Sequence, residues 1–240
     1  MKKKSSFKTR ALTNVALGAL LLSVGFACLF PTSAAVSTEG GEMDVYRSAG
    51  KDTGYVSLMF NVYWGTEEVF DILQILEINQ AKATFFIGGC WADDNVDCLK
   101  AIYGAGHELG NHGYFHKDHK NLSQADNEKE IQTCNRFVAL STGVTPTLFA
   151  PPSGSYGKTC LSVCEALGMK TILWSRDTID WRDKDADLVY KRATKDIKGG
   201  EFVLMHPMAH TVKALDKILK YYESCNLKAV TVSQNLQGEG

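Results

Sequence analysis

Residues 55–87 read YVSLMFNVYWGTEEVFDILQILEINQAKATFFI, and this stretch decides the fold. Residues 55–60 form an apolar run with the length of a buried strand, and residues 82–87 form another, which ends at Gly88. Between them, residues 66–80 carry apolar side chains at helical spacing, with Thr66 as the expected N-cap. The order strand, helix, strand predicts two parallel strands that are joined by a crossover helix.

The same alternation continues to the C-terminal part of the chain. Strands are expected at residues 55–60, 82–87, 107–111, 147–150, 170–174, 202–205 and 229–232. Helices are expected at residues 66–80, 95–103, 123–141, 158–167, 186–197 and 212–224, with Ser123 as an N-cap. Strands that alternate with helices predict an α/β fold with a parallel sheet, either open and doubly wound or closed as a barrel.

Composition excludes several classes of protein. The chain has 240 residues, of which 45% are hydrophobic and 22% charged, as in an ordinary globular protein. A formal net charge of −1 gives no basic excess for nucleic acid, so no nucleic-acid partner is expected. The first expected strand is not followed by a Gly-x-Gly-x-x-Gly turn, which leaves dinucleotide binding without support.

The first 35 residues have the layout of an export signal. Five basic and no acidic side chains precede a long apolar stretch, and small residues at 31–35 offer a cleavage site. About 20 apolar residues can also span a bilayer, so the segment is either a cleaved signal or a membrane anchor. We expect an exported protein, secreted or held at the outer face of the cytoplasmic membrane, with a linker at 36–53 and one domain at 54–235.

Export would change the net charge of the mature chain and the expected state of its cysteines. Residues 36–240 carry 21 basic and 27 acidic side chains, a net charge of −6, which disfavours adhesion to anionic surfaces. The segment therefore provides the only expected contact with a membrane. An even number of cysteines in an exported chain suggests disulfides, in pairings that the sequence does not specify. These are Cys90, Cys98, Cys134, Cys160, Cys164 and Cys225. Cys90 and Cys98 offer the nearest plausible loop closure.

Polar residues gather just after the expected strands, at Asn61, His112, Asp177 and His206. The carboxyl ends of parallel strands share one edge of the sheet, and this edge is where α/β folds build their sites. We therefore expect one cleft that these four side chains surround together with His116 and Asp180.

Two patterns indicate specific chemistry within this set. His112 and His116 lie four residues apart, a spacing that allows both imidazoles to hold one ion of the zinc, cobalt or nickel class. A histidine that ends a core strand, as His206 does, can serve as an acid or a base. Asp177 and Asp180 follow the strand that ends at Trp174, and two aspartates in a loop are by themselves more typical of a turn.

In this order, the motifs resemble those of the polysaccharide deacetylase family, the NodB-homology domain of carbohydrate esterase family 4. The resemblance covers about residues 54–235. The matching segments are residues 59–65, 112–116, 150–154, 177–181 and 204–206. The phrases Asn-Val-x-Trp-Gly, Ala-Pro-Pro-Ser-Gly-Ser and Leu-Met-His-Pro resemble a sporulation-associated branch of the family.

The resemblance implies a distorted (β/α)₇ barrel and hydrolysis of N-acetyl groups on peptidoglycan or chitin-like glycan, assisted by a divalent metal. It gives His112 and His116 as metal ligands, His206 as the catalytic acid, and Asp180 and Asp177 as its carboxylate partners. The same resemblance implies a monomer, with cell-wall or spore glycan as the partner. The expected substrate groove comprises Trp64, Pro152, Tyr156, Trp181 and Leu204.

Three positions depart from the family pattern. Asn61 stands where the family has its general base, and an amide cannot accept a proton near neutral pH. Val62 replaces the third metal ligand, and Ala150 replaces the arginine that pairs with the base. Two protein ligands predict weak metal binding or none. If binding proves tight, a third ligand has to be found, with Asp118 and His119 the first candidates.

Two functional hypotheses follow from these departures. The first is an exported, metal-assisted deacetylase in which Asp177 or a metal-bound hydroxide replaces the base. The second is a degenerate member that binds wall or spore glycan without turnover, with Trp64, Trp174 and Trp181 lining a sugar groove.

Overall fold

The structure is a computed structural model that describes residues 44–238. The predicted export segment and most of the predicted linker lie outside the described residues, so these expectations stay predictions. Within residues 44–238, no helix has the length and apolar character that crossing a membrane requires.

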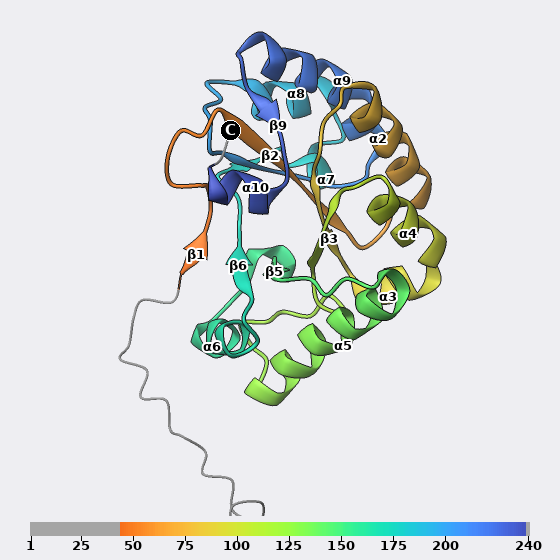
Figure 1. The fold of residues 1–240 in the computed structure, drawn as a ribbon, viewed down its shortest axis with the longest axis vertical. Helices are drawn as coiled ribbons and strands as arrows, with labels where there is room; N and C mark the ends of the chain where they lie inside the picture. Colours follow the sequence, from red (N-terminus) through yellow and green to blue (C-terminus); the bar gives the residue numbers. More distant parts are fainter. Residues whose placement is uncertain (1–43, 239–240) are drawn as a thin grey trace, which may run out of the picture. The chain divides into compact units, whose positions relative to one another are not determined.

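One sheet of parallel ladders forms the centre of the described part (Figure 1). Its strands are β1 (Val45–Tyr46), β2 (Tyr55–Val62), β3 (Thr84–Ile87), β4 (Glu108–Asn111), β5 (Leu148–Phe149), β6 (Lys170–Ile172), β7 (Arg176–Asp177), β8 (Phe202–Met205) and β9 (Lys228–Ala229). The order is β1-β6-β5-β4-β3-β2-β8-β7, and β9 adds to the start of β2. The sheet curls into an incomplete barrel, because no ladder among the described strands joins β7 to β1. The expected distorted (β/α)₇ barrel is confirmed.

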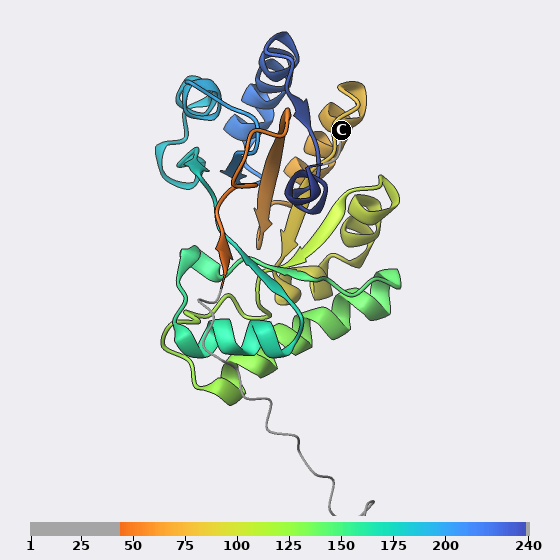
Figure 2. The same cartoon turned by 60° about the vertical axis from the view of Figure 1, so that its left-hand side comes forward.

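Helices cover the outside of the curled sheet (Figure 2). They are α2 (Thr66–Ile78), α3 (Gly89–Asp94), α4 (Val96–Gly104), α5 (Gln124–Thr142), α6 (Lys158–Ala166), α7 (Asp180–Asp183), α8 (Ala186–Thr194), α9 (Ala209–Ser224) and α10 (Val232–Gln237), with a short 3₁₀ turn at Pro152–Gly154. Neighbouring helices pack against one another in the order α8, α9, α2, α4, α5, α6. All six helices expected from the sequence are present.

The two faces of β2 explain how the sheet divides the core. Phe60 and Val62 are fully buried in the cluster between the sheet and the helices, together with Ile72 of α2. Met59 points the other way, into a smaller cluster inside the curled sheet. Side chains alternate along a strand, so Asn61 shares the inner face with Met59, whereas Val62 faces the helices.

The C-terminal end and the linker differ from the sequence predictions. The strand expected at 229–232 is wrong beyond Ala229, because Thr231 caps α10 by accepting a hydrogen bond from the Gln234 amide. Val232 then enters the inner cluster from a helix. Strand β7 at Arg176–Asp177 was not expected, and residues 45–46 of the predicted linker form β1 beside β6.

One of the two expected N-caps is confirmed. Ser123 accepts a hydrogen bond from the Asp126 amide and caps α5. Thr66 is not a cap: Gly65, with φ 78°, precedes α2, and the Thr66 hydroxyl donates to Asn95 instead. Gly65 is required there, because a Cβ would lie 2.5 Å from the Pro207 carbonyl oxygen.

The expectation of disulfides is not met. All six described cysteines are free thiols, and Cys98, Cys134, Cys160 and Cys164 are buried. Cys98 lies in the core under α4, where it packs as an apolar side chain, so it does not close a loop with Cys90.

Candidate active site

A cavity of about 300 Å³ opens at the carboxyl-terminal edge of the sheet. It is lined by Asn61, Trp64, His112, His116, Ser153, Trp174, Asp177, Trp181, Leu204 and His206. The strand register explains the assembly, because Asp177 pairs with Leu204 and Met59 pairs with the same residue on the other side of β8. Parallel strands in this register bring the residues at their ends to one place, as the sequence predicted.

Asp180 and His206 form a buried pair at the wall of the cavity. One carboxylate oxygen of Asp180 lies 2.7 Å from His206 Nδ1, and the other accepts from the His206 amide at 2.7 Å and the Thr211 hydroxyl at 2.8 Å. Burial alone would raise the pKa of Asp180, but the hydrogen bonds and the charge of His206 outweigh it and lower that pKa. The ionised carboxylate therefore fixes the imidazole, and Nε2 is the ring nitrogen left for a ligand.

His112 and His116 lie together across the cavity, with ring centroids 5.1 Å apart. His112 Nδ1 lies 2.7 Å from the carbonyl oxygen of Ala150, which can only accept. The proton of neutral His112 is therefore on Nδ1, and Nε2 keeps a free lone pair. Burial and the nearby His116 lower the pKa of His112 to about 3, so it is neutral at ordinary pH.

The donor set fits a metal ion only in part. A neutral imidazole with a fixed tautomer suits a zinc-class ion, and His112 meets this requirement. Within residues 44–238, however, no three His, Cys, Asp or Glu side chains come close enough to hold an ion. Asp118 is turned to the surface, where it accepts hydrogen bonds from Ser155 and Asn121. Two imidazoles are thus the protein's contribution to any metal site.

The loop that carries the two histidines is held from α5. Glu130, which is buried, accepts hydrogen bonds from the amides of Tyr114 and Phe115 at 3.1 and 2.8 Å. Asn111 accepts from the Gly113 amide at 2.7 Å. No motif in the sequence indicated that Glu130 has this role, because the residue lies in the middle of a helix pattern.

Asn61 is placed differently from the other polar residues of the cavity. Its side chain is buried, and its Oδ1 has no hydrogen-bond partner. A buried acceptor without a partner costs about 1–3 kcal/mol unless a water or a ligand satisfies it. Asn61 thus presents an unused hydrogen-bond acceptor to whatever enters the cavity.

Aromatic side chains form much of the remaining wall. Trp64 stacks on His206, with ring centroids 5.6 Å apart and planes within 6° of parallel, and its Nε1 donates to Met208 Sδ. Trp181 is 50% exposed at the rim, and Trp174 contributes a third ring. Exposed indole faces beside a polar cavity are suited to sugar rings, which present both C–H faces and hydroxyls.

Three residues at or beside the cavity have a strained backbone conformation. His116, Ser153 and Ile179 all have φ between 54° and 56°, although none is glycine. Ile179 is β-branched and therefore the most strained, and its amide donates to Asp177 Oδ1 at 2.8 Å. Such conformations cost about 1–3 kcal/mol each and are found mainly at functional sites.

Some predicted site residues do not line the cavity. Asp180 lies behind His206. Pro152 is buried beside Gly113, and Ser153 takes the place at the wall that the sequence analysis gave to Pro152. Tyr156 packs against the hydrophobic cluster under α6. Pro152 and Tyr156, both predicted to line the substrate groove, therefore lie behind the cavity wall and support it. Val62 faces the helix-side core, while Ala150 contributes its carbonyl oxygen to His112.

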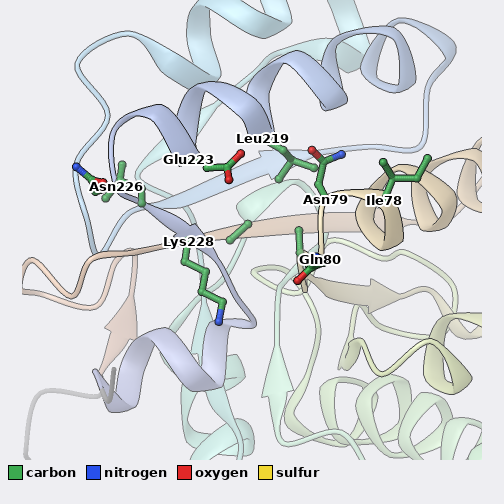
Figure 3. Close-up of a pocket in the computed structure, with 10 residues that line it drawn as sticks. Ile78, Asn79, Gln80, Leu219, Glu223, Asn226 and Lys228 are labelled. Atoms are coloured by element: carbon green, nitrogen blue, oxygen red, sulfur yellow. The ribbon is translucent and has the colours of Figure 1, made fainter.

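A larger hollow lies elsewhere, at the start of β2. It measures about 570 Å³ and is formed where the ends of α2 and α9 meet β9 (Figure 3). Figure 3 shows Asn79, Gln80 and Lys228 around it, with none of the predicted site residues. The smaller cavity, where His112, Asp177 and His206 converge, is therefore the candidate active site.

The chain matches known proteins along most of its length. The model of a family described as "Polysaccharide deacetylase" matches residues 48–172. YlxY, an uncharacterized protein of Bacillus subtilis, is 34% identical over 76% of this chain and 57% of its own length. The peptidoglycan-N-acetylglucosamine deacetylase PgdA of Listeria monocytogenes is 32% identical over 70% of this chain and 35% of its own length. The chain thus spans little more than half of YlxY and about a third of PgdA.

Solved structures match over the same region. BA3943 of Bacillus anthracis, described as a CE4 family pseudoenzyme, superposes with a TM-score of 0.78 and 34% identity, covering 82% of this chain and 70% of its own. A mutant of BA3943, described as a pseudoenzyme with restored enzymatic activity, superposes with the same TM-score and 32% identity, covering 82% and 72%.

Proposed function

We propose, from the premise that this chain belongs to the polysaccharide deacetylase family, that it binds an N-acetylated wall or spore glycan without hydrolysing it. The observation that carries the proposal is Asn61, a buried amide at the position of the family's general base. An amide cannot take a proton from an attacking water near neutral pH. The similarity to a protein described as a pseudoenzyme supports this choice.

The cavity contains the hydrogen-bonding groups and aromatic surfaces that binding of an N-acetylated sugar requires. The unpartnered Oδ1 of Asn61 is an acceptor for the N–H of an acetamido group, which every N-acetylated sugar carries. His206, fixed by Asp180, offers Nε2 to the same ligand, and the indole faces of Trp64 and Trp181 flank it. A bound divalent ion would add Lewis-acid polarisation of the acetyl oxygen, held by His112 and His116 alone.

The proposed function is tested by titrating a chitin tetramer into the protein in a calorimeter. We expect Trp181→Ala to lower the affinity about tenfold, because an aromatic contact of roughly 1.4 kcal/mol is lost. Tyr103→Ala is the matched control, since Tyr103 is an exposed aromatic on α4, outside the cavity. Equal affinities of the two variants for a ligand that the wild type binds would refute the proposal, as would failure of the wild type to bind both this tetramer and a peptidoglycan tetrasaccharide.

A slow deacetylase is the second candidate, because Asp177 lines the same cavity as His112 and His116. In this alternative Asp177 acts as the base, and the ion supplies the activated water. Acetate release from the chitin tetramer and from acetylated peptidoglycan, with and without zinc, separates the two functions. We expect no release by the wild type; release that Asp177→Asn abolishes would establish the enzyme instead.

A further inference from the structure

A second hollow adjoins the cavity at Asp177. It measures about 410 Å³ and is lined by Arg176, Asp177, Leu188, Lys191, Arg192 and Lys195. Asp177 lines both spaces, so the two adjoin at β7, and the hollow lies between this strand and α8. We call these six residues the basic groove.

Both arginines of the basic groove have partners. Arg176 Nε is 2.8 Å from the Glu201 carboxylate, and its other nitrogens donate to the carbonyl oxygens of Lys195 and Asp196. Arg192 pairs with Asp183 and donates to the carbonyl oxygen of Thr178. Their charges are balanced, and their role is to fix β7 against α8.

The two lysines have no such partners. Lys191 and Lys195 lie four residues apart at the C-terminal end of α8, both are exposed, and neither forms an ion pair with a described residue. A cation near a helix C-terminus stabilises the helix. This effect does not depend on which side of the helix the cation lies, so it does not explain why both lysines line the hollow beside the cavity. The two unpaired lysines outweigh the one carboxylate of the groove, Asp177, which leaves a local charge of about +1 in a chain whose net charge is −1.

Asp177 determines where an anion can lie. Asp177 lines both spaces, so its negative charge disfavours a second carboxylate in the cavity, while Lys191 and Lys195 attract one in the adjoining hollow. Leu188, 36% exposed, adds an apolar surface beside the lysines. The arrangement thus accommodates an uncharged acetamido sugar in the cavity, with an acidic substituent on the same glycan reaching α8.

Building on the proposed function, we propose that the basic groove binds a carboxylate carried by the glycan, such as the lactyl carboxylate of an N-acetylmuramic acid residue that bears no stem peptide. The protein thereby distinguishes an acidic amino-sugar polymer from a neutral one. Lys191 and Lys195 determine this specificity, and the cavity itself recognises the acetamido group that both polymers share.

The test compares two tetrasaccharides of equal length by calorimetric titration. One is the neutral chitin tetramer, and the other is a peptidoglycan tetrasaccharide with free lactyl carboxylates. We expect the wild type to prefer the acidic ligand. Lys191→Gln/Lys195→Gln should weaken its binding roughly fivefold to twentyfold, as loss of two partly exposed charge pairs implies, and leave the neutral ligand unchanged.

The matched control is Lys100→Gln/Lys129→Gln, which removes the same charge from exposed positions on α4 and α5. This control should bind both ligands as the wild type does. Equal binding of the two tetrasaccharides by the wild type, or equal loss of affinity in both double variants, would contradict carboxylate binding by the basic groove. Either result would leave glycan binding by the cavity unaffected. Failure of the wild type to bind either ligand overturns the proposed function as well.

Discussion

Asn61 and Val62 are adjacent in sequence but face opposite sides of β2, and this difference governs any attempt to restore catalysis. Asn61 lies on the inner face and lines the cavity, whereas Val62 is fully buried between the sheet and the helices. An aspartate at position 61 would enter a polar cavity. At position 62 it would enter an apolar core, where an unpaired carboxylate is costly.

We therefore predict that Val62→Asp lowers the free energy of unfolding by about 3 kcal/mol or more, and that Asn61→Asp changes it much less. Urea denaturation followed by far-UV circular dichroism measures both. The triple change Asn61→Asp, Val62→Asp and Ala150→Arg, which restores the family pattern, should consequently fold poorly. Asn61→Asp/Ala150→Arg is the better variant for an acetate-release assay, and stable folding of Val62→Asp would contradict the assigned orientation.

Metal binding gives a second prediction at this scale. With His112 and His116 as the two protein ligands, zinc should bind weakly, and less than one equivalent should survive purification. His112→Ala should remove the remaining binding, measured by titration with zinc and by metal analysis of the purified protein. Tyr103→Ala serves again as a control. Retention of a full equivalent through dialysis would show that a further ligand completes the site.

Most residues of the cavity and one residue that supports them, Asp180, were identified from the sequence, but Glu130 and Thr211 were missed. His112, His116, Asp177 and His206 were found from motif spacing and strand ends, because both depend only on local order along the chain. Glu130 and Thr211 make their contacts across long sequence separations from helix positions. Nothing in a helical pattern distinguishes a buried, functional glutamate from a solvated one.

At the scale of elements, α5 positions the loop that carries the histidine pair. Glu130→Ala removes the acceptor of two loop amides, so we predict faster hydrogen exchange at Tyr114 and Phe115 and weaker zinc binding. Glu128→Ala is the control, because Glu128 is exposed on the same helix and accepts a hydrogen bond from Gln132, away from the histidine loop. Exchange measured by mass spectrometry or NMR should separate the two variants.

If Glu130→Ala leaves the exchange of both amides unchanged, α5 does not hold the loop. A loss of stability in both variants to the same degree would likewise point to a general effect on the helix. Glu130→Gln keeps one acceptor oxygen, and its exchange rates should fall between those of the wild type and Glu130→Ala.

Elements with a clear apolar pattern followed from the sequence, and elements without one did not. The six outer helices show helical spacing of apolar residues, and the strands β2, β3 and β8 are near-continuous apolar runs, because they are buried on both faces. Strand β7 and helix α7 have two and four residues, most of them polar, and show neither pattern. Helix α10 was mistaken for the end of a strand because Val230 and Val232 are β-branched, while the capping role of Thr231 decides the local structure.

At the scale of the whole molecule, buried histidines link folding to pH. His107 is 5% exposed, and its Nδ1 accepts a hydrogen bond from the Ala83 amide at 3.3 Å, which only the neutral ring can do. Burial, with a smaller effect of the Lys82 charge, lowers the pKa of His107 to about 4 from an ordinary value of 6.5. The pKa values of His112, His116 and His119 are lowered as well, in each case mainly by burial.

The lowered pKa values of these histidines all make the folded protein less stable as the pH falls. Between about pH 4 and pH 6.5 the unfolded chain binds protons at His107 that the folded chain does not, so acid favours unfolding. The free energy of unfolding should be constant with pH above about 6.5 and fall below it. Each buried neutral histidine contributes about 1.4 kcal/mol per pH unit within its own window.

We predict that His107→Gln flattens this dependence, because glutamine keeps an acceptor for the Ala83 amide but does not titrate. Urea denaturation at pH 4.5, 5.5, 6.5 and 7.5 gives the slope for wild type and variant. Leu140→Ala provides the control: Leu140 is exposed on α5 and has no ionisable group, so this variant should keep the wild-type slope. An unchanged slope in His107→Gln would mean that His107 is protonated in the folded protein, in contradiction to its contact with Ala83.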